Sequence, residues 1–437
     1  MRSPRLRVTL SVTVLGALLL AAGAVDAART PRPPVSPPEV AVAVAPPVAQ
    51  LRTLLRGPTV PVAPPPPPEQ VSAVVGDEPL TMTFERTVRS LDGVAATTRT
   101  VAAMRGLFGS VTADGTPRDV VPPGMRIPVS VTAIDPATYL DVLVGPVPPD
   151  DAALVRTLGA GEVLLSTRSA ALRGLDVGAR VDLGDADGLV VAGVVSDAVA
   201  RGGEFLVTLE DRDTVGFTFG GREALLVRHA GTAPVRAALD TSAEAAEATE
   251  GDGDTLRVWH GGRRVPLVLD TLTLKERFGE FAFRLVLDQR EIDVDPAYVE
   301  ANIVKERMPV IGTVRCHRAI MDDLRAAVDE LIAAGHEDWL SPRRYAGCFY
   351  PRRIGFGREN LSRHTWGIAI DLNVDFSLPG AGPVAPDDLV AIMGRHGFRW
   401  GGDFSTPDNH HFEWVGEAAT VRPDRAPDPD GGDTTDA

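Results

Sequence analysis

The sequence contains little of several residue types that mark particular classes of protein. Aromatic residues make up 5% of the 437 residues, and there are two cysteines. Lys275 and Lys305 are the only lysines, so arginine carries nearly all of the positive charge. Acidic residues outnumber basic ones by 59 to 44, which gives a net charge of -15. This charge argues against a nucleic-acid partner, because binding a phosphate backbone requires a basic surface.

The first 28 residues have the pattern of an export signal. Arg2, Arg5 and Arg7 precede an apolar run over residues 9–25, and small residues follow it. A charged start, an apolar middle and a small-residue end are typical of a secretory signal. The run is slightly shorter than the about 20 residues that a membrane-spanning helix needs. We therefore expect an exported protein, extracellular or associated with the cell envelope, with an uncleaved membrane anchor as the alternative.

The two cysteines, Cys316 and Cys348, are expected to form a disulfide. In an exported chain an isolated pair favours a disulfide over two free thiols. The alternative is a zinc site that uses Cys316 and His317, but adjacent residues rarely converge on one metal ion and no second pair exists. On the chain-entropy model, closing this loop contributes about 3–4 kcal/mol to stability. The bridge would also fix the loop that carries Arg352.

The rest of the chain divides by composition. Residues 29–69 are rich in proline and predict a linker, either an extended spacer or a passive segment. Residues 70–245 contain short β-rich runs between Gly and Asp turns, and they predict a domain without a catalytic set. A linker is expected at 246–267, a second domain at 268–416, and a disordered acidic tail at 417–437. From Arg315 to Ala334, apolar residues recur at helical spacing. We expect α+β folds.

Two segments of the second domain carry residue types that bind metal ions. The first is Ser362-Arg-His-Thr-Trp-Gly-Ile-Ala-Ile-Asp371. From Gly367 onward, alternation predicts a half-buried strand with Asp371 on the face opposite the aliphatic residues. His364 lies just before this strand, where a turn can bring its ring back beside Asp371. Neutral imidazole and carboxylate are ligands that a catalytic zinc ion uses.

The second segment, Asp408-Asn-His-His-Phe-Glu413, also predicts a strand. Phe412 and Trp414 share one face of this strand, while His411 and Glu413 share the other. If the aromatic pair faces the core, His411 faces the cleft and His410 does not, which makes His411 the expected third ligand. Asp408 lies in a turn three residues earlier. Its carboxylate is placed to take a proton from a water molecule at the metal's open position.

The order and spacing of these residues resemble a known family. Ser-x-His-x-x-Gly-x-Ala-x-Asp, then Gly-Gly-Asp-Phe, then Asp-x-x-His-Phe-Glu resembles the zinc D-alanyl-D-alanine carboxypeptidases and L-alanyl-D-glutamate endopeptidases of bacterial and phage cell-wall metabolism. The likeness covers residues 268–416. It implies a small antiparallel sheet backed by helices and a Zn²⁺ ion held by His364, Asp371 and His411. It also implies that Asp408 is the catalytic base.

The same resemblance implies a substrate-binding arginine upstream of the first motif. Arg352 lies where that arginine is expected, with the adjacent Arg353 as an alternative. Ser362, the first residue of the motif, is a further candidate for contact with substrate. The substrates implied are stem peptides of peptidoglycan, with either a D-Ala-D-Ala or an L-Ala-D-Glu bond cleaved.

Two other classes of function remain open. The second domain can be a zinc-containing module that binds wall peptides without cutting them. The chain can also be a transporter accessory protein, because residues 162–183 resemble the extracytoplasmic core domain of macrolide-exporter-type ABC permeases. A base such as Asp408 beside a metal favours the enzyme, since a pure binding module has no need of one.

Overall fold

The computed structural model describes most of the chain after the proline-rich segment. The described ranges are 69–76, 79–184, 188–217, 221–250, 256–260, 269–354, 360–373, 385–404 and 408–416. The expected export signal, nearly all of the proline-rich linker and the acidic tail lie outside these ranges. Among the helices that the ranges contain, none is both long enough and apolar enough to cross a membrane.

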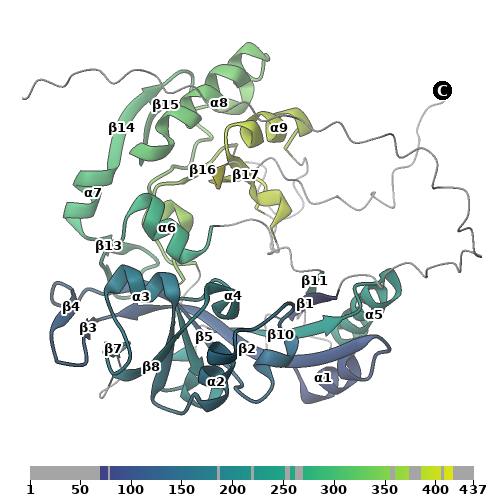
Figure 1. Ribbon diagram of the computed structural model, residues 1–437. Helices are drawn as coiled ribbons and strands as arrows, with labels where there is room; N and C mark the ends of the chain where they lie inside the picture. Colours follow the sequence, from purple (N-terminus) through teal and green to yellow (C-terminus); the bar gives the residue numbers. More distant parts are fainter. Residues whose placement is uncertain are drawn as a thin grey trace, which may run out of the picture. The chain divides into compact units, whose positions relative to one another are not determined.

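The first domain is built on one large mixed sheet (Figure 1). Within the described residues this sheet has 11 strands in the order β11-β1-β10-β2-β5-β9-β6-β8-β7-β3-β4. Most neighbouring strands are antiparallel, but β5 pairs with β9 and β6 pairs with β8 in parallel. The strands are β1 (Gln70–Val75), β2 (Val94–Leu107), β3 (Gly109–Val111), β4 (Pro117–Val120), β5 (Ile127–Ile134), β6 (Glu162–Ser166), β7 (Arg180–Asp182), β8 (Leu189–Val195), β9 (Phe205–Thr208), β10 (Arg222–His229) and β11 (Arg257–Trp259).

Local sequence explains several of these elements. In β8 every second side chain is buried, as expected for a strand with one face toward the core. The side chain of Ser166 accepts a hydrogen bond from the Ser169 N–H at the start of α3. The helix ends at Gly174, whose φ of 62° favours glycine. The helices of this domain are α1 (Met82–Arg89), α2 (Pro149–Thr157), α3 (Thr167–Arg173), α4 (Asp197–Ala200) and α5 (Ala233–Glu250), with 3-10 turns at Tyr139–Val142 and Leu209–Arg212.

The segment expected to be a linker, 246–267, is partly structured. It contains the end of α5, and β11 pairs antiparallel with β1. The composition indicated a segment with little to bury. However, β11 forms its hydrogen bonds with the edge of β1, a strand that is distant in sequence. The described part of this segment therefore extends the first domain.

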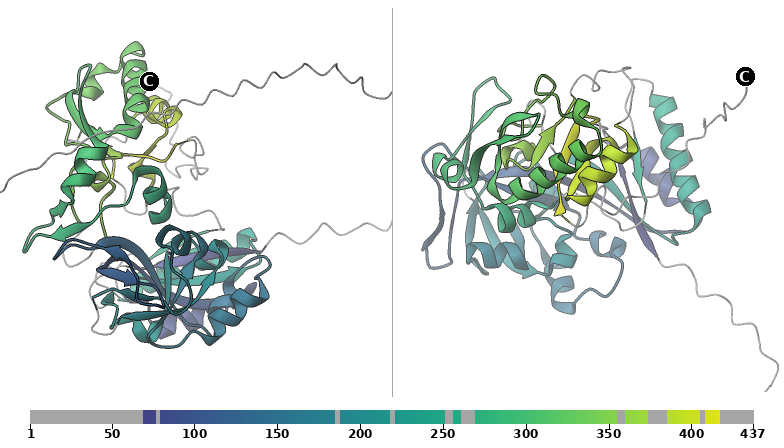
Figure 2. Two further views of the ribbon diagram at one scale, coloured as in Figure 1. Left: turned by 60° about the vertical axis from the view of Figure 1, so that its left-hand side comes forward. Right: turned by 90° about the horizontal axis from the view of Figure 1, so that it is seen from above.

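The second domain packs helices on small antiparallel sheets, as the α+β expectation states. Within the described residues the sheets are β12-β13, β14-β15 and β16-β18-β17. Helices α8 and α9 lie side by side, and α9 also contacts β17 (Figures 1 and 2). The elements are α6 (Thr271–Phe278), β12 (Phe283–Leu285), β13 (Ile292–Val294), α7 (Pro296–Asn302), β14 (Ile303–Met308), β15 (Gly312–His317), α8 (Met321–Ala333), β16 (Ala369–Asp371), α9 (Asp387–Arg395), β17 (Phe398–Trp400) and β18 (His411–Trp414), with 3-10 turns at Arg318–Ile320, Glu337–Leu340, Arg363–Thr365 and Gly401–Asp403.

The helix expected from Arg315 onward begins later than its spacing predicts. Residues up to His317 belong to β15, and α8 starts at Met321 after one 3-10 turn. The strand prevails because each of its residues pairs with a residue of β14. Leu324 and Val328 on α8 are buried in the core of this domain.

Candidate metal centre and active site

Three side chains from the two sequence motifs meet at one end of the small sheet. His364 lies in the 3-10 turn before β16, Asp371 ends β16, and His411 begins β18. Asp371 and His411 are direct partners in the antiparallel pairing of these strands. Gly367 makes the turn back from His364 with a φ of 69°, and a Cβ there would lie 2.9 Å from a backbone nitrogen of β15.

The ligand atoms of these three residues converge. His364 Nε2 lies 3.1 Å from Asp371 Oδ1, and His411 Nδ1 lies 3.0 Å from the same oxygen. The three side chains are buried, and their ligand atoms all lie within 4.8 Å of one another. Such a group can hold a metal ion. Two imidazoles and a carboxylate are also the donor set of a catalytic zinc site.

The second nitrogen of each histidine has a different partner. His364 Nδ1 donates to the backbone carbonyl of Cys348 at 2.8 Å. Cys348 is bonded to Cys316, which confirms the expected disulfide. His411 Nε2 lies 3.9 Å from Glu413 Oε2. Histidines that bind zinc usually direct their other N–H toward a carbonyl or a carboxylate, so both rings are oriented as ligands are.

Glu413 is itself held in place. Arg363 Nε donates to its Oε1 at 3.1 Å, and Arg363 Nη2 donates to the Leu269 carbonyl at 2.8 Å. Glu413 is 2% exposed, and Arg363 is the cationic partner that offsets the cost of burying its carboxylate. Sequence reasoning placed Glu413 on the same face as His411, but its pairing with Arg363 was not predicted.

The charges of this cluster shift its pKa values strongly. Burial alone would raise the pKa of Asp371. Hydrogen bonds from His364 and His411 outweigh this effect, so the pKa lies well below its usual range. Burial lowers the pKa of His411, whereas Asp371 and Glu413 raise it to about 9. The carboxylates therefore favour the protonated form of His411. A divalent cation can replace the proton of His411, because metal binding releases protons from its ligands.

Two further residues of the second motif lie close together, and one of them, His410, approaches Asp371. The side chain of Asp408 is 42% exposed, and its Oδ1 lies 3.0 Å from His410 Nδ1. His410 Nε2 lies 3.7 Å from Asp371 Oδ2, although strand alternation placed His410 away from the cleft. The reason is local. Residues 409–410 form a turn and β18 begins only at His411, so alternation does not apply to His410.

The two candidate arginines point to different places. Arg352 Nη2 lies 3.8 Å from Asp371 Oδ2, and its guanidinium lies 4.9 Å from the centre of the Tyr350 ring. Arg353 instead bonds to the hairpin before α7, since its guanidinium donates to the Gln289 carbonyl and its backbone N–H donates to the Arg290 carbonyl at 2.7 Å. Burial lowers the pKa of Arg352 below the ordinary value for arginine. Of the two, Arg352 is the one placed beside the metal-binding group.

Ser362 has a structural contact. Its N–H donates to the Arg352 carbonyl at 3.0 Å, and its hydroxyl accepts from the His364 N–H at 3.4 Å. The residue is 7% exposed. It therefore links the arginine loop to the first histidine, and its contact with substrate stays a prediction.

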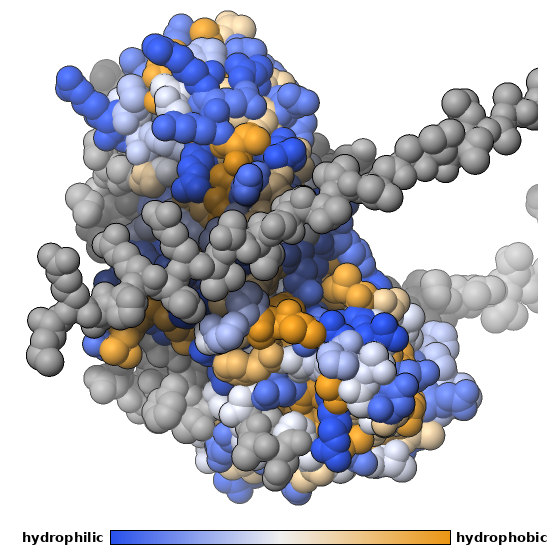
Figure 3. Space-filling view, turned by 90° about the vertical axis from the view of Figure 1, so that its left-hand side faces the viewer, coloured by the Kyte–Doolittle hydropathy of each residue, from blue (hydrophilic) through white to orange (hydrophobic). Residues whose placement is uncertain are grey.

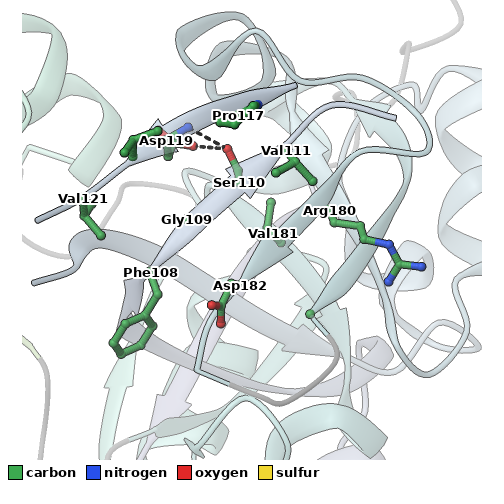
Figure 4. Close-up of a pocket in the computed structure, with 12 residues that line it drawn as sticks. Phe108, Gly109, Ser110, Val111, Pro117, Asp119, Val121, Arg180, Val181 and Asp182 are labelled. Atoms are coloured by element: carbon green, nitrogen blue, oxygen red, sulfur yellow. Dashed lines mark hydrogen bonds between the residues drawn. The ribbon is translucent and has the colours of Figure 1, made fainter. Parts of the chain in front are cut away.

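A separate pocket of about 510 Å³ lies in the first domain at the β7-β3-β4 edge of the sheet (Figure 4). Its walls include Phe108, Val181 and Asp182, and the Ser110 hydroxyl donates to Asp119 Oδ2 at 2.5 Å. Among the described residues, the only group of three clustered metal-ligating side chains is the one at His364. On the face shown in Figure 3, hydrophobic side chains form small patches between hydrophilic ones.

Comparisons with known proteins find similarity to a protein family and to solved structures. Among curated proteins, none matches this chain. The periplasmic region of MacB from Actinobacillus actinomycetemcomitans is similar in structure, with a TM-score of 0.29 and 12% identity over 43% of this chain and 87% of that one.

The extracellular domain of the noncanonic ABC-type transporter YknZ from Gram-positive bacteria has a TM-score of 0.28 and 14% identity, over 42% of this chain and 99% of that one. Residues 356–414, which include both motifs, match the family described as D-alanyl-D-alanine carboxypeptidase. The C-terminal part of this chain thus carries a domain of the D-alanyl-D-alanine carboxypeptidase family.

Proposed function

We propose that the second domain is a zinc-dependent peptidase that hydrolyses stem peptides of peptidoglycan, at a D-Ala-D-Ala or an L-Ala-D-Glu bond. The observation that carries the proposal is the convergence of His364, Asp371 and His411 inside the segment that matches the carboxypeptidase family. Their ligand atoms lie close together, and the ring nitrogen of each histidine that does not face Asp371 faces another acceptor. This arrangement fits Zn²⁺ better than it fits a purely structural cluster.

When bound at such a site, zinc polarises a peptide carbonyl and increases the acidity of water. The side chain of Asp408 is exposed enough to reach solvent and substrate. Its carboxylate accepts the proton of the attacking water and then transfers it to the leaving amine. Arg352 lies near Asp371 and holds an anionic group of the substrate or the developing oxyanion.

We also infer that the protein is exported. The Cys316–Cys348 disulfide is typical of proteins in oxidising compartments. The N-terminal signal pattern supports the same location, and peptidoglycan lies outside the cytoplasmic membrane.

The test is to measure zinc content and cleavage of muropeptides by mass spectrometry on the full chain and on Asp408→Ala. The proposal expects one zinc ion per chain in both proteins, with cleavage lost only in the variant. Asp329→Ala is the matched control, because Asp329 is exposed on α8. Zinc bound without cleavage of either bond type would overturn the enzyme and favour the wall-peptide binding module.

A further inference from the structure

The first and second domains meet at a buried cluster of charged side chains. Glu204, which precedes β9, accepts from Lys275 Nζ at 3.0 and 2.8 Å and from Arg173 Nη2 at 3.1 Å. Glu280 accepts from the same arginine nitrogen at 2.9 Å and lies 2.9 Å from Lys275 Nζ. The side chains of Arg173, Glu204 and Lys275 have no exposed surface. Each cation therefore lies between carboxylates of both domains.

This cluster requires both domains to complete it. Glu204 and Arg173 come from the first domain, and Lys275 and Glu280 come from the second. Arg173 also donates to Asp119 at 2.9 Å. Removing a charged group from water is costly, and a charged partner left alone in such a site strongly destabilises the fold. Because the charges match in one arrangement, the cluster specifies how the two domains dock.

Other contacts surround the cluster. Arg168 on α3 forms a double ion pair with Glu276 on α6, at 2.9 and 2.5 Å. Arg126 and Phe283 exchange two backbone hydrogen bonds of 2.8 Å each, which form a β-bridge across the domains. The Asn360 side chain accepts from the Met104 N–H at 2.8 Å. Residues after Pro64 form one unit by their contacts, in line with these bonds.

Helix α6 connects this interface to the metal centre. Lys275 lies one turn before Phe278, whose carbonyl accepts from His317 Nε2 at 3.1 Å. The Phe278 ring meets the Trp414 ring edge-on, with centroids 5.6 Å apart. Trp414 ends β18, the strand that begins with His411. A shift of α6 would therefore displace the side chains that pack against β18, the strand that carries the candidate zinc ligand His411.

We propose that the first domain is the docking partner of the peptidase domain within the same chain, and that the Glu204–Lys275–Arg173 cluster positions α6 against β18. The docking does not depend on the proposed activity. Only the effect on the metal centre rests on the proposed function. In this arrangement the first domain is a fixed part of the enzyme, held by charge complementarity rather than tethered loosely.

The presence of only two lysines makes a direct experiment possible. We would acetylate the full native chain with an amine-reactive ester and follow Lys275 and Lys305 separately by mass spectrometry. Lys305 is exposed on β14 and serves as the internal standard. If the domains dock, Lys275 reacts at least about 100-fold more slowly than Lys305, because labelling requires local opening. Equal rates in the folded protein would overturn the docking.

The second measurement uses Glu204→Gln in the full chain, with Lys305→Met as the control. Without the Glu204 charge, labelling of Lys275 should rise about 10-fold or more while the circular dichroism spectrum is unchanged. Zinc retention against a chelator should weaken by several-fold, and it should be unchanged in Lys305→Met. Faster Lys275 labelling with unchanged zinc retention would overturn the positioning role. Because neither readout uses catalysis, a failure here is distinct from a failure of the proposed peptidase activity.

Discussion

The buried charge clusters at Lys275 and at Asp371, both within the described residues, differ in kind. In the interface cluster, the cations Arg173 and Lys275 alternate with carboxylates, and each charge has an opposite partner. In the cluster at Asp371, the groups are acceptors or titratable nitrogens, and their atoms point at one common centre. The first arrangement is complete without an ion, whereas the second gains from a divalent cation. Convergence of ligand atoms, and not burial of charge alone, distinguishes a metal site.

The pKa values of the carboxylates would not separate the two clusters. Burial alone would raise the pKa of both Asp371 and Glu280. In both cases the nearby cationic groups have the larger effect, so the pKa is lowered overall. The direction is the same because any buried carboxylate with cationic partners behaves in this way. The geometry of the partners decides which cluster has chemistry to perform.

The largest predicted effect separates the clusters by their response to loss of one carboxylate. Asp371→Ala should abolish stoichiometric zinc binding, because it removes the only anionic member of the ligand group. The Glu204→Gln protein should still bind one zinc ion per chain at saturating metal, although its affinity for zinc should be weaker. Elemental analysis after gel filtration measures both. Full zinc in the purified Asp371→Ala protein would contradict the assignment of the ligands.

The next prediction concerns the disulfide, which anchors one histidine of the metal centre. Replacing both Cys316 and Cys348 with serine should lower the free energy of unfolding by about 3–4 kcal/mol on the chain-entropy model. It should also weaken zinc binding, because the Cys348 carbonyl orients His364. Urea unfolding and chelator competition measure the two effects. Loss of stability with unchanged zinc affinity would show that the carbonyl is held without the bridge.

A smaller effect is expected at the carboxylate behind His411. Glu413→Gln keeps the size of the side chain but removes the charge opposite His411 Nε2. We expect zinc affinity to fall about 10–100-fold, as for other outer-shell partners of metal ligands. Competition with a zinc-binding dye measures the affinity. Glu330→Gln on α8 is the control, since Glu330 pairs with Arg395 and His396 away from the site.

The smallest predicted effect is the pH response of the interface. The pKa of Glu280 in the folded protein lies below its ordinary value of 4.5, because Lys275 and Arg173 outweigh the effect of burial. A lowered folded pKa means that the contribution to stability is complete above about pH 4.5 and is lost as the pH falls further. Melting temperatures from pH 6 to pH 3.5 should therefore decline, and the decline should be shallower in Glu280→Gln. Identical pH profiles of the two proteins would contradict the expected contribution of Glu280 to stability.

Short-range patterns predicted a substantial part of this molecule. The alternation after Gly367 predicted a strand, because strand periodicity is a local property, and β16 forms there. The expected half-burial was wrong, since all three residues of β16 (Ala369–Asp371) are buried. Two isolated cysteines predicted the disulfide, and the order of the two motifs predicted the carboxypeptidase family, which residues 356–414 match. The roles of Asp408 and Arg352 in catalysis stay predictions, although the structure places Arg352 beside Asp371.

What the sequence by itself determined was the chemistry available: α+β elements, a disulfide, and histidines and carboxylates at strand ends. The tertiary structure alone decided the partners. His410 came beside Asp371 because the chain turns there, and Arg363 came to face Glu413 across 50 residues of sequence. Lys275 became buried against Glu204 because the first domain covers it. Burial and pairing depend on contacts between distant segments, and no local pattern of residue types encodes which distant segment will supply them.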